Sequence, residues 1–457
     1  MVDVVILGGG PGGYAAALYA HNFDLSVALV ERDLVGGTCL HRGCIPAKSW
    51  LQSAEVFSAV RRAAEFGVLV DEPGFDWQVA LDRKNDVVGK LHKGLEGLLR
   101  KRKVDILAGT GHITGPKTVA VTGADGETAT VEGRHLIVAT GSVPRSIPGY
   151  EIDGERIVTS DHALDWEKRP DRVAIIGAGA IGCEFASLLV DLGAEVHLFE
   201  MMDQVVPGME PEAARVLSRA LAKRGVAIHT GVGVDPAQTG DGGVTVPYGD
   251  ESVTVDAVLV AVGRAPVTDG IGLDNTRVEL DRGFVPVDLA TMLTTEPGVY
   301  AVGDIVAGMP QLAHAGFAEG IAAITHIGTG EASPVDPRSI PMVVYTHPEV
   351  AAVGLTEAQA AERGIEVQVA KHGFGGVGRA LIIGETDGIV KVVSQVDGPI
   401  VGATIAGPLA GELIHELMYA VAWEALPAEA AAFIHAHPSV AEAVGETLLA
   451  ASGRSLH

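Results

Sequence analysis

The chain has 457 residues, of which 47% are apolar and 20% charged, so it holds enough material for roughly two to four domains with buried cores. Its formal charge of −25 argues against nucleic acid as a partner, because binding a phosphate backbone requires a basic surface. No uninterrupted apolar run reaches about eighteen residues, and the start "MVDVVILGGG" lacks the pattern of a secretory signal. We therefore expect a cytoplasmic protein without a membrane span.

One strand–helix–strand pattern occurs twice. "VVILGGGPGGYAAALYAHNFDLSVALVE" (residues 4–31) and "VAIIGAGAIGCEFASLLVDLGAEVHLFE" (residues 173–200) place glycines at the same offsets and end on a glutamate twenty-three residues after the first glycine. Such glycines permit a tight turn, the approach of a pyrophosphate and close helix packing, while the acid accepts hydrogen bonds from a ribose. The repeat predicts two dinucleotide sites, at Gly8, Gly10, Gly13 and Glu31, and at Gly177, Gly179, Gly182 and Glu200.

The residues after each glutamate bear on the choice of nucleotide. Met201, Met202 and Asp203 follow Glu200, and none of them could receive a 2′-phosphate, so the second site is predicted to bind NAD rather than NADP. The glycine pattern alone leaves FAD and NAD open at the first site. A cysteine pair close downstream of that site favours a flavin.

That pair lies in "GGTCLHRGCIPAKSW" (residues 36–50), where Cys39 and Cys44 stand five positions apart. On a regular helix their Cα atoms would be roughly 8 to 9 Å apart, which exceeds the limit of about 7 Å for a disulfide. A bond between them needs a distorted turn, which Gly43 could supply, and strained disulfides are the reducible ones. The pattern favours a redox pair. A structural staple and half of a metal site remain open, although a zinc site needs about four ligands.

Further elements follow in chain order. Residues 84–103 predict an amphipathic helix with Val87, Leu91, Leu95 and Leu99 on one stripe, and 135–149, 257–266 and 298–306 each predict a buried strand that ends at a glycine turn. From about residue 336 alternating apolar strands precede alanine-rich helices, which is typical of an α+β domain. These features predict an FAD-binding domain at 1–147 and 264–335, an NAD-binding domain at 148–263 and an interface domain at 336–457.

The segment "GGTCLHRGCIPAK", joined to the two glycine units and to "HAHPSVAEA" near the C-terminus, resembles the pyridine nucleotide-disulfide oxidoreductases, and within them most of all the dihydrolipoamide dehydrogenases. The resemblance covers essentially the whole chain. It implies an α/β fold with two Rossmann-like domains and a C-terminal α+β dimerisation domain. It also implies oxidation of dihydrolipoamide to lipoamide and reduction of NAD+ through a redox disulfide and non-covalent FAD, with a lipoyl domain or free dihydrolipoamide as substrate and a 2-oxo acid dehydrogenase complex as a possible partner.

The family's roles fall on matching residues. Cys39 would be the thiol that exchanges with substrate, and Cys44 the thiolate that lies against the flavin. Lys48 would lie near the flavin ring and pair with Glu184. The remaining positions implied to contact FAD are Gly37, Thr38, Thr140, Gly141, Asp304 and Ala313, and Gly263 is implied to contact NAD.

The resemblance takes the base from the far end of the chain. His437 precedes Pro438, which we expect at the first position of a helix, and Glu442 would follow on its first turns and hold the imidazole. His435 is the competing candidate, but it lacks this five-residue spacing to a glutamate. In the family the histidine reaches the disulfide of the other subunit, which implies an obligate homodimer with a shared site.

The same residues bear on which related class of enzyme the chain resembles. Glutathione-type reductases use NADPH, which the residues after Glu200 disfavour, and mercuric reductases carry an extra cysteine pair, whereas this sequence ends "ASGRSLH". Soluble transhydrogenases lack a complete cysteine pair. A mycothione-type reductase stays open. A redox sensor without turnover is disfavoured, because it would need no thiol base. Nothing explains why "FGGVGRALI" (residues 374–382) lacks the asparagine expected from the family.

Overall fold

We describe a computed structural model of the chain, in which residues 1–456 are placed. The chain divides into two compact units. One consists of Met1–Ser49, Leu81–Arg145 and Arg264–Pro337, and the other of Trp50–Ala80, Ser146–Gly263 and Arg338–His457. The long helices α3 (Cys44–Arg61) and α4 (Trp77–Lys101) contribute residues to both units. Helix α4 confirms the amphipathic helix predicted for 84–103, but it begins at Trp77.

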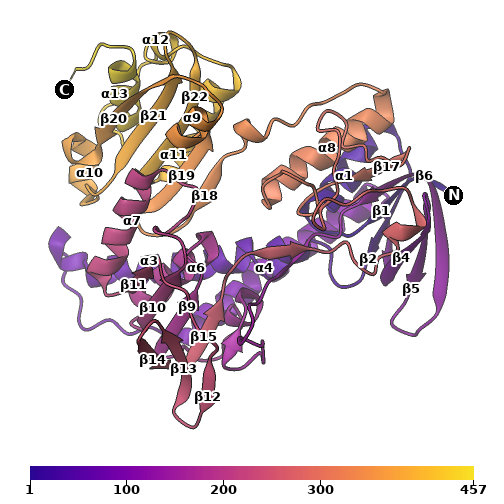
Figure 1. Ribbon diagram of the computed structural model, residues 1–457, viewed down its shortest axis with the longest axis horizontal. Coiled ribbons are helices and arrows are strands. Elements are labelled where there is room, and N and C mark those ends of the chain that lie inside the picture. Colours follow the sequence, from indigo (N-terminus) through magenta and orange to yellow (C-terminus); the bar gives the residue numbers. More distant parts are fainter. Residues whose placement is uncertain (457) are drawn as a thin grey trace. The chain divides into compact units, whose positions relative to one another are not determined.

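The first unit is built on a seven-stranded sheet in the order β3-β2-β1-β6-β5-β4, with β17 also paired to β6 (Figure 1). Strands β1, β2, β3 and β17 run parallel to their neighbours, as the βαβ pattern requires, and β4 and β5 return as an antiparallel extension of β6. The strands of this sheet are β1 (Val2–Leu7), β2 (Val27–Glu31), β3 (Asp105–Ala108), β4 (Thr110–Gly115), β5 (Thr118–Thr122), β6 (Thr128–Val138) and β17 (Val299–Ala301). A separate antiparallel pair is formed by β7 (Ser142–Pro144) and β16 (Arg264–Pro266), and the unit's further helices are α1 (Pro11–Tyr19), α2 (Gly37–His41) and α8 (Ala313–Thr329).

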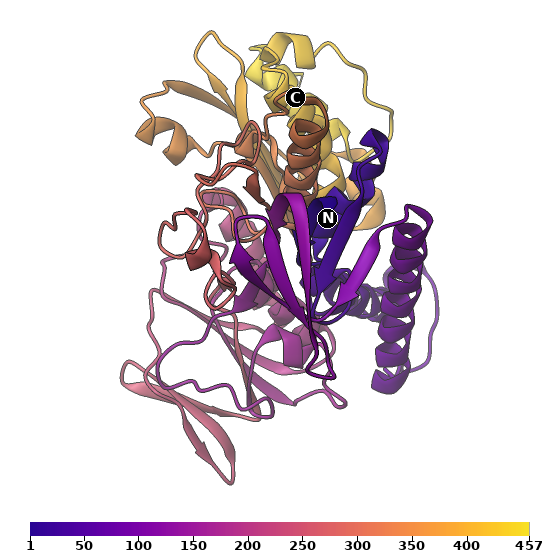
Figure 2. The same cartoon turned by 90° about the vertical axis from the view of Figure 1, so that its right-hand side faces the viewer.

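The second unit contains a parallel sheet of order β11-β10-β9-β15-β8, which repeats the βαβ arrangement of the first. A three-stranded antiparallel ribbon, β12-β13-β14, extends away from this sheet in both views (Figures 1 and 2). The elements are β8 (Ile157–Val158), α5 (Ser160–Ala163), β9 (Arg172–Ile176), α6 (Ala180–Asp191), β10 (Glu195–Glu200), α7 (Pro211–Arg224), β11 (Ala227–Thr230), β12 (Gln238–Gly240), β13 (Gly243–Tyr248), β14 (Glu251–Val255) and β15 (Ala257–Val260).

The same unit carries the C-terminal antiparallel sheet, of order β18-β19-β22-β21-β20. Helices α11 and α13 pack on it around a core that includes Phe374, Ile405 and Leu417. Its elements are β18 (Met342–Val344), β19 (Glu349–Gly354), α9 (Glu357–Glu362), β20 (Val367–Gly373), α10 (Gly378–Ile383), β21 (Ile389–Gln395), β22 (Ile400–Gly407), α11 (Ala410–Ala422), α12 (Pro427–Ala430) and α13 (Glu442–Ala451). The structure confirms the predicted α/β class, with one mixed and one parallel sheet and an α+β segment. The boundaries of a three-domain division stay a prediction.

Candidate active site

The turn between β1 and α1 and the first turn of α1 each contain one position at which only glycine fits. Gly8 has a φ of +108°, and a Cβ there would lie 2.2 Å from the carbonyl oxygen of Ala139. A Cβ on Gly13 would lie 1.9 Å from the carbonyl oxygen of Gly8. The second unit repeats both restrictions at Gly177 and Gly182. Each helix therefore starts close against its preceding strand, as a dinucleotide turn requires.

The middle glycine of each motif, Gly10 or Gly179, faces open space and not a backbone oxygen. A Cβ on Gly179 would meet no heavy atom within 4 Å, and one on Gly10 would meet only the Cα of Gly37, at 4.0 Å. Gly10 and Gly179 are also the residues that precede α1 and α6, and neither helix has a side-chain cap. The first N–H groups of both helices are thus left for another acceptor, and the turns fit the pyrophosphate of a dinucleotide.

The glutamates that end the two strand–helix–strand patterns, Glu31 and Glu200, are held by the same kind of hydrogen bond. Glu31 accepts hydrogen bonds from the backbone N–H groups of Gly9 (2.7 Å) and Asp33 (2.8 Å). Glu200 accepts them from Ala178 (2.8 Å) and Met202 (2.9 Å). Each carboxylate therefore lies beside its own glycine turn and keeps further lone pairs that can accept bonds from ribose hydroxyls.

Asp304 follows the short strand β17 and is fixed by a chain of polar side chains. Ser142 donates from Oγ to Asp304 Oδ2 at 2.5 Å, and Arg264 Nε donates to the same hydroxyl at 2.7 Å. Gln311 donates from Nε2 to the carbonyl oxygen of Asp304 at 3.2 Å. Sequence reasoning missed Ser142 and Gln311, because their contact with Asp304 depends on tertiary packing.

The other positions predicted to contact FAD lie in the same unit. Gly37 approaches Gly10 so closely that a Cβ on Gly37 would lie 2.6 Å from the Gly10 Cα, and Thr38 is the next residue of α2. Thr140 donates to the carbonyl oxygen of Val267 (2.6 Å). Gly141 has a φ of +71° and Ala313 begins α8, whereas Gly263, predicted to contact NAD, follows β15 of the second unit with a φ of +105°.

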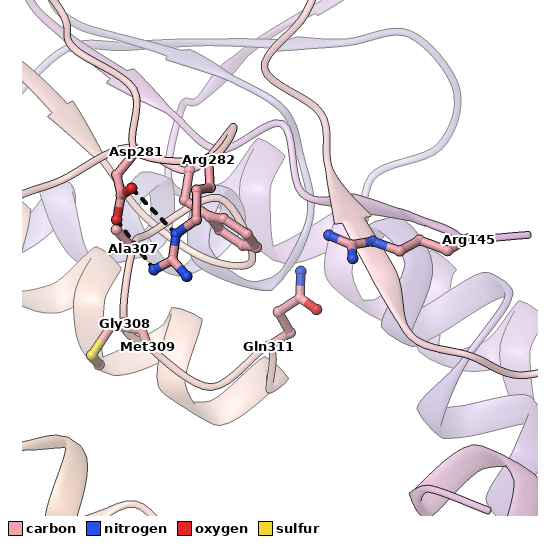
Figure 3. Close-up of a pocket in the computed structure, with 8 residues that line it drawn as sticks. Arg145, Asp281, Arg282, Ala307, Gly308, Met309 and Gln311 are labelled. Atoms are coloured by element: carbon pink, nitrogen blue, oxygen red, sulfur yellow. Dashed lines mark hydrogen bonds and ion pairs between the residues drawn. The ribbon is translucent and has the colours of Figure 1, made fainter. Parts of the chain in front are cut away.

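A cavity of about 620 Å³ adjoins the Asp304 loop. In Figure 3 the Gln311 amide lies between the guanidinium groups of Arg282 and Arg145, and Arg282 is paired with Asp281. Because Asp281 also lines the cavity and offsets the charge of Arg282, the lining carries one net positive charge, that of Arg145, within an acidic protein. Such a lining is complementary to the phosphates of an approaching dinucleotide.

The two cysteines stand at a break between helices. Cys39 lies in α2, Cys44 begins α3, and the break falls at Arg42 and Gly43, so the continuous helix that would separate the thiols is absent. Both cysteines are in the reduced, thiol form. Hydrogen bonding with Cys44, burial and the charge of Cys44 raise the pKa of Cys39 well above its ordinary value. The predicted distortion of the turn is confirmed, and it brings the two thiols into contact.

Two predicted partners lie in different units. Lys48 lies on α3 within the first unit, and Glu184 is buried on α6 in the second, where it accepts a hydrogen bond from the backbone N–H of Tyr345 at 3.0 Å. The pairing of Lys48 with Glu184 therefore stays a prediction.

His437 and Glu442 form the predicted pair. Glu442 Oε1 accepts from His437 Nδ1 at 2.8 Å, and Oε2 accepts from the backbone N–H of Ser439 at 3.0 Å. The hydrogen bond from His437 holds the pKa of Glu442 below its usual range, helped by the Ser439 N–H. The expectation that Pro438 starts the helix was wrong: the His437–Pro438 bond is cis, a turn geometry, and α13 begins at Glu442 itself.

His435 also has a carboxylate partner, which sequence spacing could not reveal. Its Nε2 lies 2.8 Å from Glu416 Oε1, and that hydrogen bond raises the pKa of His435. Exposure separates the two histidines, because the side chain of His435 is 13% exposed and that of His437 is 79% exposed. The ring of His437 is therefore the more accessible of the two.

Among residues 1–456, no cluster of three or more histidine, cysteine, aspartate or glutamate side chains could hold a metal ion. Within the same residues, no helix combines the length and apolar character needed to cross a bilayer.

Family models match nearly the whole chain. The model described as pyridine nucleotide-disulphide oxidoreductase matches residues 2–320, and its dimerisation domain matches residues 340–448. The chain belongs to the pyridine nucleotide-disulphide oxidoreductase family. It is accordingly a flavoprotein disulfide oxidoreductase that uses FAD and NAD, and its C-terminal segment is a dimerisation domain. The glycine turns and glutamates described above fit both dinucleotides.

Named relatives of this pyridine nucleotide-disulphide oxidoreductase span its full length. The chain is 40% identical to "Dihydrolipoyl dehydrogenase" of Bacillus subtilis, covering 100% of this chain and 99% of the relative. It is 39% identical to the protein of the same name from Zymomonas mobilis, again over 100% and 99%. The crystal structure of LpdA from Mycobacterium tuberculosis superposes with a TM-score of 0.90 at 29% identity, covering 98% of this chain and 99% of that one.

Proposed function

We propose that this enzyme oxidises dihydrolipoamide to lipoamide and reduces NAD+ to NADH. The observation that carries the proposal is the pair of contacting thiols at the break between α2 and α3, in a chain whose full-length relatives are named for this reaction. We further propose that it serves a 2-oxo acid dehydrogenase complex in the cytoplasm. A chain with only three cysteines, two of them a redox pair, suits that reducing compartment.

The hydrogen bond to Glu442 defines what His437 can do. A carboxylate can only accept, so Nδ1 carries the proton of the neutral ring and Nε2 is left as the base. We assign to this nitrogen the proton of one substrate thiol. The thiolate so formed attacks Cys39 Sγ of the Cys39–Cys44 disulfide, and the electron pair of the broken S–S bond goes to Cys44.

The second substrate sulfur then attacks the mixed disulfide and closes the lipoamide ring, which releases Cys39. One disulfide has been formed and one reduced, with the first substrate proton on His437 and the second on the Cys39 thiol that leaves. Because the contact with Cys44 and burial raise the pKa of Cys39, the reduced pair keeps a proton on Cys39 and carries its negative charge on Cys44. FAD, when bound, supplies the transfer of this electron pair to NAD+. Gly8, Gly10, Gly13, Glu31 and Asp304 would hold it.

A dimer with a shared site is the third part of the proposal. Large apolar side chains are exposed on the C-terminal segment, notably Trp423 (77%), Phe433 (75%) and Ile434 (98%). Such side chains support burial against a second copy, since monomers seldom expose contiguous apolar patches. They lie in the chain segment that also supplies His437. We propose that His437 of the partner subunit serves the thiols of each subunit.

The test is an anaerobic titration of the FAD-loaded protein with dihydrolipoamide. We expect a long-wavelength absorption band from a thiolate beside the flavin, followed by formation of NADH when NAD+ is added. The Cys44→Ser variant, which cannot form the disulfide, should give neither signal. If the wild type also gives neither but turns over a different disulfide, the dihydrolipoamide assignment is wrong.

A further inference from the structure

Glu319 is a buried carboxyl group that the mechanism above does not use. It lies on α8 with 0% exposure, and its Oε2 accepts a hydrogen bond from the backbone N–H of Gly303 at 2.5 Å. Its Oε1 is also buried and has no hydrogen-bond partner within residues 1–456. Burying a carboxylate costs free energy when one of its oxygens lacks a hydrogen-bond partner, so we expect this side chain to have a specific role.

The helix that carries Glu319 is packed closely against α1. A Cβ on Gly320, the next residue of α8, would lie 2.5 Å from the carbonyl oxygen of Gly12 on α1. Gly316 approaches the same glycine, since its Cβ would lie 3.2 Å from the Gly12 N. Helix α8 is thereby packed tightly against α1, the helix whose N-terminus fits the dinucleotide pyrophosphate, and Glu319 is fixed with it.

The Gly303 amide leads directly to Asp304. Gly303 has a φ of +80°, in the left-handed region, and the Asp304 carboxylate that follows is held by Ser142. Gln311 holds the carbonyl side of the same residue. Three contacts thus fix this loop, and Glu319 supplies the one on the peptide that precedes Asp304.

We propose that Glu319 is a positioning residue of the FAD site, which fixes the Gly303 peptide so that Asp304 presents its carboxylate to the ribityl chain, and whose ionisation weakens FAD binding. The proposal rests on the assignment of Asp304 to FAD given above. It concerns cofactor binding and not the identity of the disulfide substrate.

The electrostatics give the sign of the pH effect. Burial raises the pKa of Glu319 to about 7, against the lowering effect of the Gly303 N–H, and the negative charge of Asp304 raises it further. Helix α8 itself carries two further titratable groups, His314 and His326, and helix α1 with the turn after it contributes only Tyr14, Tyr19 and His21. FAD brings two negative phosphates to this unit, so it binds best to the neutral form of Glu319. Its affinity should therefore fall as the pH rises through about 7.

The experiment titrates FAD-free protein with FAD between about pH 6 and pH 8 and follows the quenching of flavin fluorescence. Three variants are compared with wild type. Glu319→Gln keeps an acceptor for the Gly303 N–H but cannot ionise, and Glu319→Leu removes the acceptor. Glu349→Gln is the matched control, because Glu349 also accepts a backbone N–H, that of Gly411 at 2.8 Å, and its pKa is also raised by burial, but it lies in the C-terminal sheet.

We expect the FAD dissociation constant of the wild type to rise about tenfold over this pH range, that of Glu319→Gln to stay flat, and that of Glu319→Leu to be about tenfold weaker at low pH. The control should follow the wild type. A wild-type slope in Glu319→Gln, unchanged affinity in Glu319→Leu, or an equal loss in Glu349→Gln would each overturn the proposal. If Glu319→Leu does not fold, the slope of Glu319→Gln decides the question. Failure to oxidise dihydrolipoamide, with these FAD results intact, would count against the proposed function alone.

Discussion

Replacing His437 with glutamine removes the ring nitrogen that we assign to the substrate thiol proton. Glutamine offers no atom of comparable basicity, so the whole contribution of the general base should be lost, about 10²- to 10⁴-fold in kcat/KM for dihydrolipoamide. Folding should change little, because the His437 side chain is 79% exposed and surface substitutions usually stay within about 0.5 kcal/mol. A large loss of rate without a loss of stability is the signature that we expect.

The assay compares two reactions of the same preparation. The first is steady-state formation of NADH from dihydrolipoamide and NAD+. The second is reduction of an artificial electron acceptor by NADH, which requires no proton transfer from a substrate thiol and should be unaffected. His435→Gln is the matched control, since His435 is also bonded to a glutamate but is 13% exposed. Near-normal turnover by His437→Gln, or an equal loss in His435→Gln, would refute the assignment of the base.

Three more outcomes follow from other contacts. Gly182→Ala would place a Cβ 1.9 Å from a backbone oxygen, so NAD should bind about tenfold or more weakly in calorimetry while the flavin absorbance is retained. Lys391→Met would leave Glu210 buried without its ion pair (2.8 Å), which should lower the free energy of unfolding by about 3 kcal/mol. The melting temperature measured by calorimetry should then fall by roughly 6–12 °C. In the control Lys371→Met, whose side chain is 41% exposed, the loss should be less than about 1 kcal/mol. Burial would raise the pKa of Glu212, but hydrogen bonds from Lys371 and Lys391 lower it to about 2. Its stabilising effect is therefore present above about pH 4.5 and lost as the pH falls towards 2, and Glu212→Gln should show a shallower acid melting curve.

The parts of the fold that could be predicted from the sequence are those governed by local geometry. At Gly8 and Gly177 a side chain would clash with a backbone oxygen, so glycine at these positions indicates the turn. The break between Cys39 and Cys44 could be predicted for a similar reason, because a regular helix cannot bring residues five apart into contact.

The parts that could not be predicted depend on segments distant in sequence. The start of α13 at Glu442 was missed, because a proline can begin a helix or follow a cis bond, and the residues on either side do not decide between them. The partner of His435 was missed as well, since Glu416 precedes it by nineteen residues and lies on α11, whereas His435 lies outside any helix. The pair of His437 could be identified because its two members are only five residues apart in the sequence.

The acidic side chains show which contacts could be predicted from the sequence and which could not. Glu31 and Glu200 each bind a backbone N–H twenty-two residues upstream, and a single βαβ unit supplies both ends of each contact, so a fixed offset in the sequence predicts it. Glu319 and Glu349 make the same kind of bond, but their donors lie sixteen residues upstream and sixty-two residues downstream, on elements that only the folded chain brings together. In a chain with 58 acidic residues, composition cannot single these out. A carboxylate that faces a ligand, such as Glu31, can thus be predicted from its motif. One that holds the loop behind the ligand, such as Glu319, can be identified only from its burial in the folded chain.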